Sequence, residues 1–397
     1  MISLNRYQSL LREPHIGSTV AASVVGRLPI GMAVIAILLF IQQVDKSYAR
    51  AGIASGLYVV GVAALAPYVG RLIDRFGPRP LMLVSACAYP LALCALVAAV
   101  HTGADTLWLG VAAFTAGATL PPVSTCVRAL LRRLLTDITH LQAAYSLDSV
   151  LMESVFIVGP ALVSFFAALG WTIGAVLGAA ALGSAGSVLF MRAAAVRDWG
   201  ANPANRAPTL AGALTTPGLL PILGATLMFS VGFGLFEVSV TAVAERAGSP
   251  AMAGVILATA SVGSATAAFF YGSRSWPLSH AGQYKVAMIA MALGLFALAP
   301  LEHLGWFCAV SLIAGAPMST VLAAQSVLIA GIAPRQALAE SFTWAATSLL
   351  TGVSLGIAGG GLILERAPPA LALLAAAVST CLGLMIAIVG VRPAASH

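Results

Sequence analysis

Long apolar runs separated by short polar segments fill almost the whole chain. A helix that crosses the apolar core of a bilayer, about 30 Å thick, needs roughly 20 residues, and each run is near that length. The sequence therefore predicts an all-α membrane protein. We expect twelve transmembrane helices, close to residues 17–42, 49–69, 80–100, 106–130, 142–168, 171–192, 217–243, 251–271, 284–301, 305–331, 339–364 and 368–390.

The composition excludes a soluble protein. Hydrophobic residues make up 60% of the chain and charged residues 8%, whereas soluble domains carry about 25% charged residues. The first apolar run is longer than the core of a signal peptide, so we expect it to be retained as the first span. The five cysteines lie inside apolar runs and no histidine lies in the middle of a span. The sequence therefore predicts no metal site and no cofactor.

The positive charges indicate which way the spans point. With the N-terminus inside, fifteen of the twenty Lys and Arg residues fall in cytoplasmic segments, and four fall in outer loops: Lys46, Arg50, Arg246 and Arg366. This bias predicts a multi-pass protein of the inner membrane with both termini in the cytoplasm. Because the basic residues are spread over short loops, the net charge of +7 reflects topology and does not indicate nucleic-acid binding.

The chain divides near its middle into two similar halves. Residues 193–216 form the longest hydrophilic connection, so we expect a cytoplasmic linker between an N-terminal six-helix bundle (1–192) and a C-terminal one (217–397). Residues 51–70 align without a gap to 253–272. This alignment matches three pairs of glycines at an offset of 202: Gly52 with Gly254, Gly61 with Gly263, and Gly70 with Gly272. "AGATLPPVST" also echoes "AGAPMSTVLA", and the two matches together indicate a duplication.

One short stretch, "YVGRLIDRFGPRP" (68–80), concentrates charge in this apolar chain. It joins the second span to the third, and Gly70 and Gly77 allow a tight reversal there. The arginines fit the cytoplasmic side, but the carboxylate of Asp74 contributes nothing to topology. We expect Asp74 to bond nearby arginines or the positive N-terminus of another helix.

The same stretch resembles the loop 2–3 signature of the major facilitator superfamily of transporters. The residues that match its pattern are Gly70, Leu72, Asp74, Arg75 and Gly77, and Pro78 stands where an arginine is usual. The resemblance implies two pseudo-symmetric six-helix bundles that rock about a central cleft. We assign conformational gating to this loop and to one arginine at the inner end of the fourth span: Gly70, Arg71, Asp74, Arg75, Gly77, Arg79 and Arg128.

In that fold, the first, fourth, seventh and tenth spans line the substrate cavity. Their sequences offer a mostly apolar set with one acid and one amide: Met32, Pro121, Pro122, Phe229, Phe233, Phe236, Glu237, Met318 and Gln325. Such a lining suits a small amphipathic or aromatic molecule, cations included, better than a sugar, which needs many hydrogen bonds. The phenylalanines could equally pack against neighbouring helices or lipid.

Four ionisable residues lie well inside predicted spans: Arg27, Asp148, Glu153 and Glu237. Each costs about 2.5–3.5 kcal/mol there and is usually paired or functional. Similar depth suggests an Arg27–Glu153 pair, and Asp148 can pair with Arg128 as a structural or gating contact. Glu237 has no evident basic partner. Glu153 or Glu237 is the candidate proton carrier, and a fixed ion pair that never titrates is the alternative for Arg27 and Glu153.

Glycines recur at every fourth residue in the second span (Gly52, Gly56) and in the eleventh (Gly352, Gly356, Gly360). Small residues at this spacing let helix backbones approach closely. In the superfamily fold these two spans face each other between the halves, so we expect a smooth surface along which the halves move. Glycine is also common in membrane helices that serve no such role.

These features favour a secondary active transporter. The chain has no P-loop and no nucleophile constellation, so we expect neither an ATP-driven pump nor an enzyme. Gly159-Pro160 resembles part of the antiporter motif of proton-coupled drug exporters, although it could simply kink the helix. We therefore expect a monomeric exporter of small amphipathic molecules that uses protons and works in the lipid bilayer. The alternatives are a proton symporter that imports an organic acid or a sugar-like nutrient and, from a different class, a membrane sensor or an intramembrane enzyme.

Overall fold

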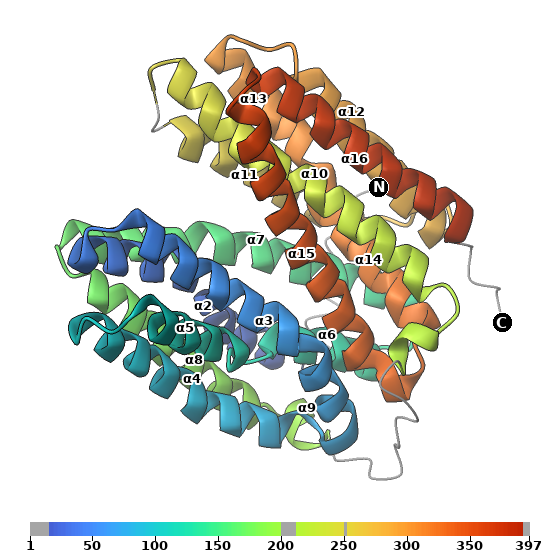
Figure 1. Cartoon of the computed structure of the whole chain (residues 1–397). Coiled ribbons are helices and arrows are strands. Elements are labelled where there is room, and N and C mark those ends of the chain that lie inside the picture. Colours follow the sequence, from blue (N-terminus) through green and yellow to red (C-terminus); the bar gives the residue numbers. More distant parts are fainter. Residues whose placement is uncertain (1–15, 200–211, 250–251, 392–397) are drawn as a thin grey trace.

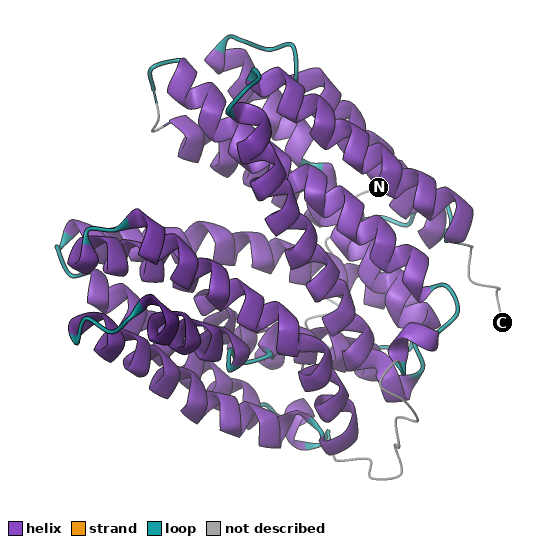
Figure 2. Ribbon diagram, in the orientation of Figure 1, coloured by secondary structure: helices purple, strands orange, loops and turns teal. Residues whose placement is uncertain are grey.

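The chain folds into two groups of helices that lie against each other (Figure 1), and Figure 2 shows helices joined by short loops. The computed structural model describes residues 16–199, 212–249 and 252–391. Within these residues, twelve helical stretches are long and apolar enough to cross a membrane, which confirms the predicted number of spans. The predicted linker 193–216 falls partly on residues outside the described ranges, so its bounds stay a prediction.

The helices of the first group, blue to green in Figure 1, pack mainly on one another. They are α2 (Ile16–Asp45), α3 (Tyr48–Phe76), α4 (Pro78–His101), α5 (Thr106–Ala118), α6 (Val123–Leu134), α7 (Ile138–Ala168), α8 (Thr172–Arg192) and the short α9 (Ala194–Arg197).

The second group, yellow to red, has the same order of long and broken helices. It comprises α10 (Leu219–Arg246), α11 (Met252–Ser273), α12 (His280–Leu298), α13 (Leu304–Gly315), α14 (Pro317–Ile332), α15 (Leu338–Leu364) and α16 (Pro369–Gly390), with short 3-10 turns at Ala213–Thr215 and Arg335–Ala337.

Side-chain oxygens fix where some of these helices begin. Ser47 accepts a hydrogen bond from the backbone N–H of Arg50 at the start of α3 (3.3 Å). Asp137 precedes α7 and accepts bonds from the hydroxyl (2.6 Å) and the backbone N–H (3.0 Å) of Thr139. Hydrogen bonds to a carboxylate favour its charged form, so these contacts hold the pKa of Asp137 below its usual range.

Two predicted spans, 106–130 and 305–331, are each broken into two helices. Pro121 and Pro122 lack the backbone N–H that would continue a helix, and α5 ends just before them,. Pro317 occupies the first position of α14, where a missing N–H costs little,. Both breaks lie inside the two stretches that echo each other in sequence.

Glycines of the internal repeat occupy equivalent helix crossings in the two groups. A Cβ atom on Gly61 of α3 would overlap the carbonyl oxygen of Phe114 in α5. A Cβ atom on Gly263 of α11 would overlap the carbonyl oxygen of Leu312 in α13. The matched glycines therefore permit the same close contact in each half, as expected for a duplicated structure.

Helix α2 is held between two neighbours by pairs of glycines. Gly26 lies against Gly186 of α8, and Gly31 lies against Gly159 of α7, so that a Cβ atom on Gly159 would approach the Gly31 backbone within 2.7–3.0 Å. Close approach of helix backbones is a main source of attraction between helices in lipid. These crossings fix the α2, α7 and α8 core of the first group.

The two groups meet at one end of the molecule and separate toward the other. In Figure 1 the ribbons of α3 and α15 converge where α3 gives way to α4, and they diverge toward the loop between α2 and α3. We call the region of convergence the α3–α4 end. The hydroxyl of Thr347 in α15 donates to the carbonyl oxygen of Ala63 in α3 (3.0 Å), which confirms that these two spans pack across the halves.

The glycines that suggested a sliding surface are not in that contact. A Cβ atom on Gly52 or Gly56 would meet nothing within 4 Å. Gly352 and Gly356 lie against the backbone of α10 within the second group. Gly360 also faces α10, because a Cβ atom added there would lie 3.7 Å from the Cα atom of Leu235. The prediction of a sliding glycine surface is therefore wrong. A glycine stripe specifies close packing but not the partner helix.

The two classes of glycine predict different effects of a single methyl group. Gly117→Ala places a Cβ atom onto the carbonyl oxygen of Tyr58, whereas Gly52→Ala places one in open space. We expect Gly117→Ala to destabilise the protein by about 1–3 kcal/mol and Gly52→Ala to have little effect. Thermal unfolding in detergent measures both, and equal unfolding temperatures for the two variants would contradict these crossings.

Candidate functional site

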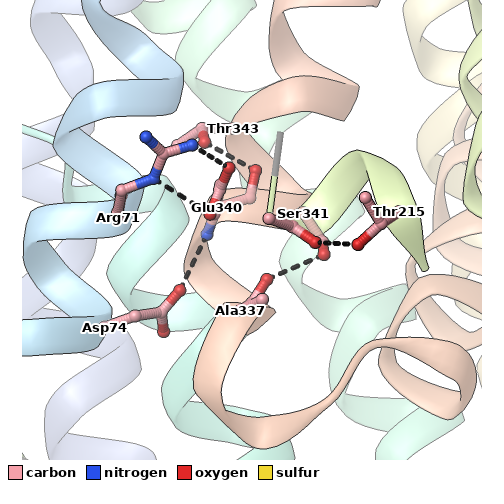
Figure 3. A network of polar contacts seen from close by, with 8 residues as sticks. Arg71, Asp74, Thr215, Ala337, Glu340, Ser341 and Thr343 are labelled. Carbon is pink, nitrogen blue, oxygen red and sulfur yellow. Dashed lines mark hydrogen bonds and ion pairs between the residues drawn. The ribbon is translucent and has the colours of Figure 1, made fainter. Parts of the chain in front are cut away.

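Asp74 links the two halves at the α3–α4 end. Its carboxylate oxygens accept hydrogen bonds from the backbone N–H groups of Ala339 (3.1 Å) and Glu340 (2.9 Å) in the first turn of α15, and Figure 3 shows the carboxylate of Asp74 pointing at this turn. The first N–H groups of a helix have no partner within the helix and carry partial positive charge. The helix N-terminus was one of the two partners that the sequence predicted for Asp74.

Arg71, one turn before Asp74, forms a second bond between the halves. Its Nη2 lies 2.6 Å from Oε1 of Glu340, and its Nε lies 3.3 Å from Oε2. The forked contact is visible in Figure 3. Glu340 is 1% exposed, and a buried carboxylate needs such a partner. Asp74 and Arg71 therefore bind the backbone and the side chain of the same residue.

The other predicted gating residues have different positions. Gly70 does not help to reverse the chain but lies inside α3, where the absence of a side chain lets Ala339 and Thr343 of α15 approach. Gly77 does form the reversal, with φ of 78° between α3 and α4,. The guanidinium of Arg75 lies over the ring of Phe76, 4.9 Å from its centre, and Arg79 lies on α4, in a cavity described below.

One aromatic and two polar contacts continue the interface toward the middle of the molecule. The aromatic pair, Tyr145 and Phe342, packs between the halves with ring centres 5.9 Å apart. Two side chains donate to backbone carbonyls of the opposite half: Arg132 Nε to Ala330 (3.0 Å) and Gln142 Nε2 to Tyr271 (3.3 Å).

Glu153 forms the innermost of these contacts. Its Oε1 atom lies 2.7 Å from the hydroxyl of Ser264 in α11 and 2.7 Å from the hydroxyl of Ser319 in α14. The two hydroxyl oxygens are themselves 2.7 Å apart, and the backbone N–H of Ser319 donates to Ser264 Oγ (3.0 Å). Both serines are at most 2% exposed, whereas Glu153 is half-buried. One acid of the first half is thus held by two hydroxyls of the second.

The predicted Arg27–Glu153 pair is wrong, because Arg27 pairs with Asp148. Arg27 Nη1 lies 2.6 Å from Asp148 Oδ1, and Arg128 Nε lies 2.9 Å from Asp148 Oδ2. The Asp148–Arg128 pair was predicted, but the sharing of one carboxylate by two guanidiniums was not. Arg27 is 0% and Asp148 3% exposed. All three residues belong to the first half, so this triad holds α2, α6 and α7 together.

The residues predicted to line the cavity fall into two groups. Met32 and Phe229 are 0% exposed, and Pro121 and Phe236 are also buried, so a role for these four residues in the substrate cavity stays a prediction. The half-buried members are Pro122, Phe233, Glu237 and Met318. Gln325 is 4% exposed, and its Oε1 atom has no hydrogen-bond partner among the described residues.

Three residues of the interface were missed by sequence reasoning. Glu340 could have been noticed as an acid at the start of the eleventh span, whereas Ser264 and Ser319 carry no signal beyond a hydroxyl inside an apolar run. No ion pair of Glu237 is seen in the part of the chain that the structure describes. Within those residues, no group of three or more His, Cys, Asp or Glu side chains could hold a metal ion.

The twelve candidate spans and the two similar groups of helices agree with the family that the loop sequence resembles. The family model of the major facilitator superfamily matches residues 19–273, which is more than half of the chain. The chain belongs to the major facilitator superfamily. Its family and fold are those of transporters and not of enzymes, and it is a multi-pass membrane protein.

Solved structures of the superfamily share this fold at low sequence identity. A bacterial homologue of the iron transporter ferroportin, in its outward-facing state, is 12% identical, with a TM-score of 0.76 over 94% of this chain and 98% of its own. The proton:xylose symporter XylE is 11% identical, with a TM-score of 0.73 over 94% of each chain. The E. coli fucose:proton symporter FucP is 15% identical, with a TM-score of 0.73 over 95% of this chain and 99% of its own. A search among curated proteins finds no match.

The bond between Arg71 and Glu340 predicts how the α3–α4 end opens. Arg71→Gln removes a contact worth about 1 kcal/mol at a partly exposed site, so we expect the open population at this end to rise about fivefold. Arg75→Gln is the matched control, because Arg75 lies on the same helix, stacks on Phe76 and forms no ion pair within the described residues. Distances between spin labels on α3 and α15, in protein without its native cysteines, measure the populations. The same opening in both variants would contradict the assignment.

The triad predicts a large loss of stability when its carboxylate is removed. Asp148→Asn leaves two guanidiniums without a counter-charge, one of them fully buried, which costs on the order of 3–5 kcal/mol. Asp105→Asn is a suitable control because Asp105 is exposed and its side chain makes no capping bond. Unfolding temperatures in detergent compare the two, and a loss no larger for Asp148→Asn than for Asp105→Asn would contradict the structural role of the triad.

Proposed function

We propose that this chain is a proton-coupled transporter that exports small amphipathic molecules and that Glu153 carries the proton. The observation that supports this most directly is the triangle formed by Glu153 Oε1, Ser264 Oγ and Ser319 Oγ, with every edge 2.7 Å long. Oxygen atoms at this separation are joined by a hydrogen bond. Each of the three edges therefore needs a proton.

The number of protons available to this triangle supports a neutral Glu153 in this conformation. A serine hydroxyl donates one hydrogen bond, and an ionised carboxylate donates none. If Glu153 is ionised, the two serine hydroxyl protons are the only ones available for three oxygen–oxygen contacts. One pair of oxygens then lies at hydrogen-bond distance without a proton between them. With Glu153 protonated, Glu153 donates to Ser264, Ser264 to Ser319, and Ser319 to Glu153. We therefore propose that Glu153 holds a proton in this conformation.

The proton on Glu153 would then favour contact between the halves. Ser264 and Ser319 belong to the second half and Glu153 to the first, so loss of the proton breaks one edge of the triangle and leaves a carboxylate in an apolar interface. The missing hydrogen bond and the negative charge on a half-buried group would both weaken the closed arrangement. A ligand shifts a conformational equilibrium by its difference in affinity for the two states, and here the proton is that ligand.

The arginines of the α3–α4 end suggest on which side of the membrane this end lies. Arg71, Arg75 and Arg79 lie at this end, and the excess of basic residues on the cytoplasmic side of membrane proteins favours a cytoplasmic position in the inner membrane. The halves are joined at this end, so the conformation would be outward-facing. Arg6, Arg12 and Arg392 near the termini and Arg206 of the linker lie outside the described residues, whereas Arg197 of the linker lies within them, on α9. A cytoplasmic location of both termini remains a proposal.

The chemistry of the half-buried residues suggests the substrate class. Phe233 and Met318 are apolar, and the only polar groups predicted beside them are the carboxylate of Glu237 and the amide of Gln325, whose Oε1 atom has no hydrogen-bond partner within the described ranges. Mostly apolar surfaces with few polar groups bind amphipathic molecules. Export is favoured by Gly159, which resembles part of the antiporter motif and lies at the crossing of α7 with α2.

Proton-coupled uptake is the second candidate function. Two of the similar structures, XylE and FucP, are described as proton symporters for xylose and fucose. The proton on Glu153 fits symport as well as antiport, because it concerns only how the halves are coupled. The direction in which substrate and proton move relative to each other separates the two functions.

Transport in proteoliposomes with an imposed pH gradient tests the role of Glu153. We expect the wild-type protein to move the amphipathic cation ethidium against the direction of proton flow. Glu153→Gln carries an amide N–H that can replace the O–H of the protonated acid but cannot release it. We expect this variant to lose its gradient-driven transport at least tenfold, whereas the control Glu302→Gln, at an exposed acid, keeps the wild-type rate. Glu237→Gln should transport ethidium more weakly but keep the dependence on the proton gradient.

Three outcomes of this experiment contradict parts of the proposal. Coupling that survives in Glu153→Gln but fails in Glu237→Gln would assign the proton to Glu237. Coupling that survives in both variants would show that neither acid carries it. Accumulation of a labelled sugar together with protons, without movement of ethidium, would establish uptake instead of export.

A further inference from the structure

A cavity of about 780 Å³ opens on the outside of the first half, where α4, α8 and α9 meet, away from the interface between the halves. Three arginines and three apolar residues are among those that line it: Arg79, Arg192, Arg197, Leu83, Val188 and Met191.

The arginines and the apolar residues occupy two levels of this cavity. Arg79 and Leu83 are four residues apart on α4, and Val188 and Arg192 are four apart on α8. Residues at this spacing share one helix face and are separated by about one turn. Arg79 lies at the start of α4 and Arg192 at the end of α8, so both arginines lie at the surface, and the aliphatic residues lie one turn deeper in the membrane.

The deeper level is apolar and open to lipid. Leu83 is 58% and Val188 38% exposed. In a chain that crosses the membrane, exposed aliphatic side chains on the outer faces of α4 and α8 contact acyl chains. The cavity therefore has a cationic rim above an apolar floor, which complements the negatively charged phosphate and the hydrocarbon chains of a phospholipid.

The three arginines have no counter-charge in the part of the chain that the structure describes. No acidic side chain forms an ion pair with them, and Asp198, which follows Arg197, is not within ion-pair distance of any of the three. Nearby arginines are already occupied, since Arg133 lies over the ring of Trp199 at 4.6 Å. Topology accounts for arginines on this side of the membrane, but it does not require three of them to converge on one cavity.

We propose that this cavity binds an anionic phospholipid. Its phosphate would lie between Arg79, Arg192 and Arg197, and its acyl chains would lie along Leu83 and Val188. Basic pockets between membrane helices are suited to anionic headgroups, and arginine binds phosphate with paired N–H donors. Because Arg197 belongs to α9, the lipid would join the first residues after the last helix of this half to the start of α4.

Lipid binding to the purified full-length protein tests the proposal. Native mass spectrometry after addition of phosphatidylglycerol or phosphatidylcholine reports the number and affinity of bound lipids. We expect the wild-type protein to retain phosphatidylglycerol at least tenfold more tightly than phosphatidylcholine. The triple variant Arg79→Gln, Arg192→Gln, Arg197→Gln should lose this preference. All three side chains are exposed, and the single variant Arg192→Gln provides a milder case that should lose part of it.

A second triple variant controls for the loss of charge. Arg274→Gln, Lys285→Gln, Arg335→Gln removes three positive charges from the second half, away from the cavity, and should keep the wild-type preference. Equal retention of phosphatidylglycerol by the wild type and the cavity variant would overturn the proposal, as would an equal loss in the control variant. Glycerol phosphate has the headgroup chemistry without acyl chains. At the concentration at which phosphatidylglycerol binds, it should not displace phosphatidylglycerol from the protein. If it does, the cavity binds a free anion and not a lipid.

Discussion

A polar or charged group inside an apolar membrane bundle needs a partner, and the way this chain meets that requirement organises the whole structure. Some partners lie within one half and others lie across the interface between the halves. Asp148 belongs to the first kind, because it neutralises Arg27 and Arg128 on neighbouring helices of the same half. Asp74, Glu340 and Glu153 belong to the second kind. The contact of the first kind holds three helices of the first half together, and contacts of the second kind join the two halves at the α3–α4 end and at Glu153.

The contacts between the halves differ in how easily water can replace them when the halves separate. Asp74 and Arg71 bind the first turn of α15 near the surface, where water can replace their partners when the halves separate. Glu153 lies deeper, at an interface made of serine hydroxyls and apolar side chains, where loss of its proton leaves an acceptor without a donor. The outer contact can therefore be given up as the halves separate, and under the proposal above the inner contact supplies the response to protons. In this account a transporter of the superfamily needs only one half-buried acid at the interface to be sensitive to a proton gradient.

The sequence predicts the number of spans, the family and the attraction of Asp74 for a helix N-terminus, because these follow from local hydropathy and from one charged motif. It does not predict which acid pairs with Arg27. Asp148 and Glu153 are five residues apart, so they differ by about 140° around the helix axis, and depth alone cannot decide which of them faces α2. The glycine stripe of α15 presents the same difficulty, since close packing is evident in the spacing but α10 as the partner is not. Ser264 and Ser319 gain significance only when three helices from two halves bring them to one carboxylate.

The state of Glu153 in the conformation described here is the central claim, and infrared difference spectroscopy tests it most directly. Protein held in this conformation by a cross-link between α3 and α15 should show, at neutral pH, the carbonyl stretch of a neutral carboxylic acid. We expect this band to disappear in Glu153→Gln and to persist in Glu237→Gln. A spectrum in which Glu153→Gln removes only the bands of an ionised carboxylate would contradict a protonated Glu153 in this conformation.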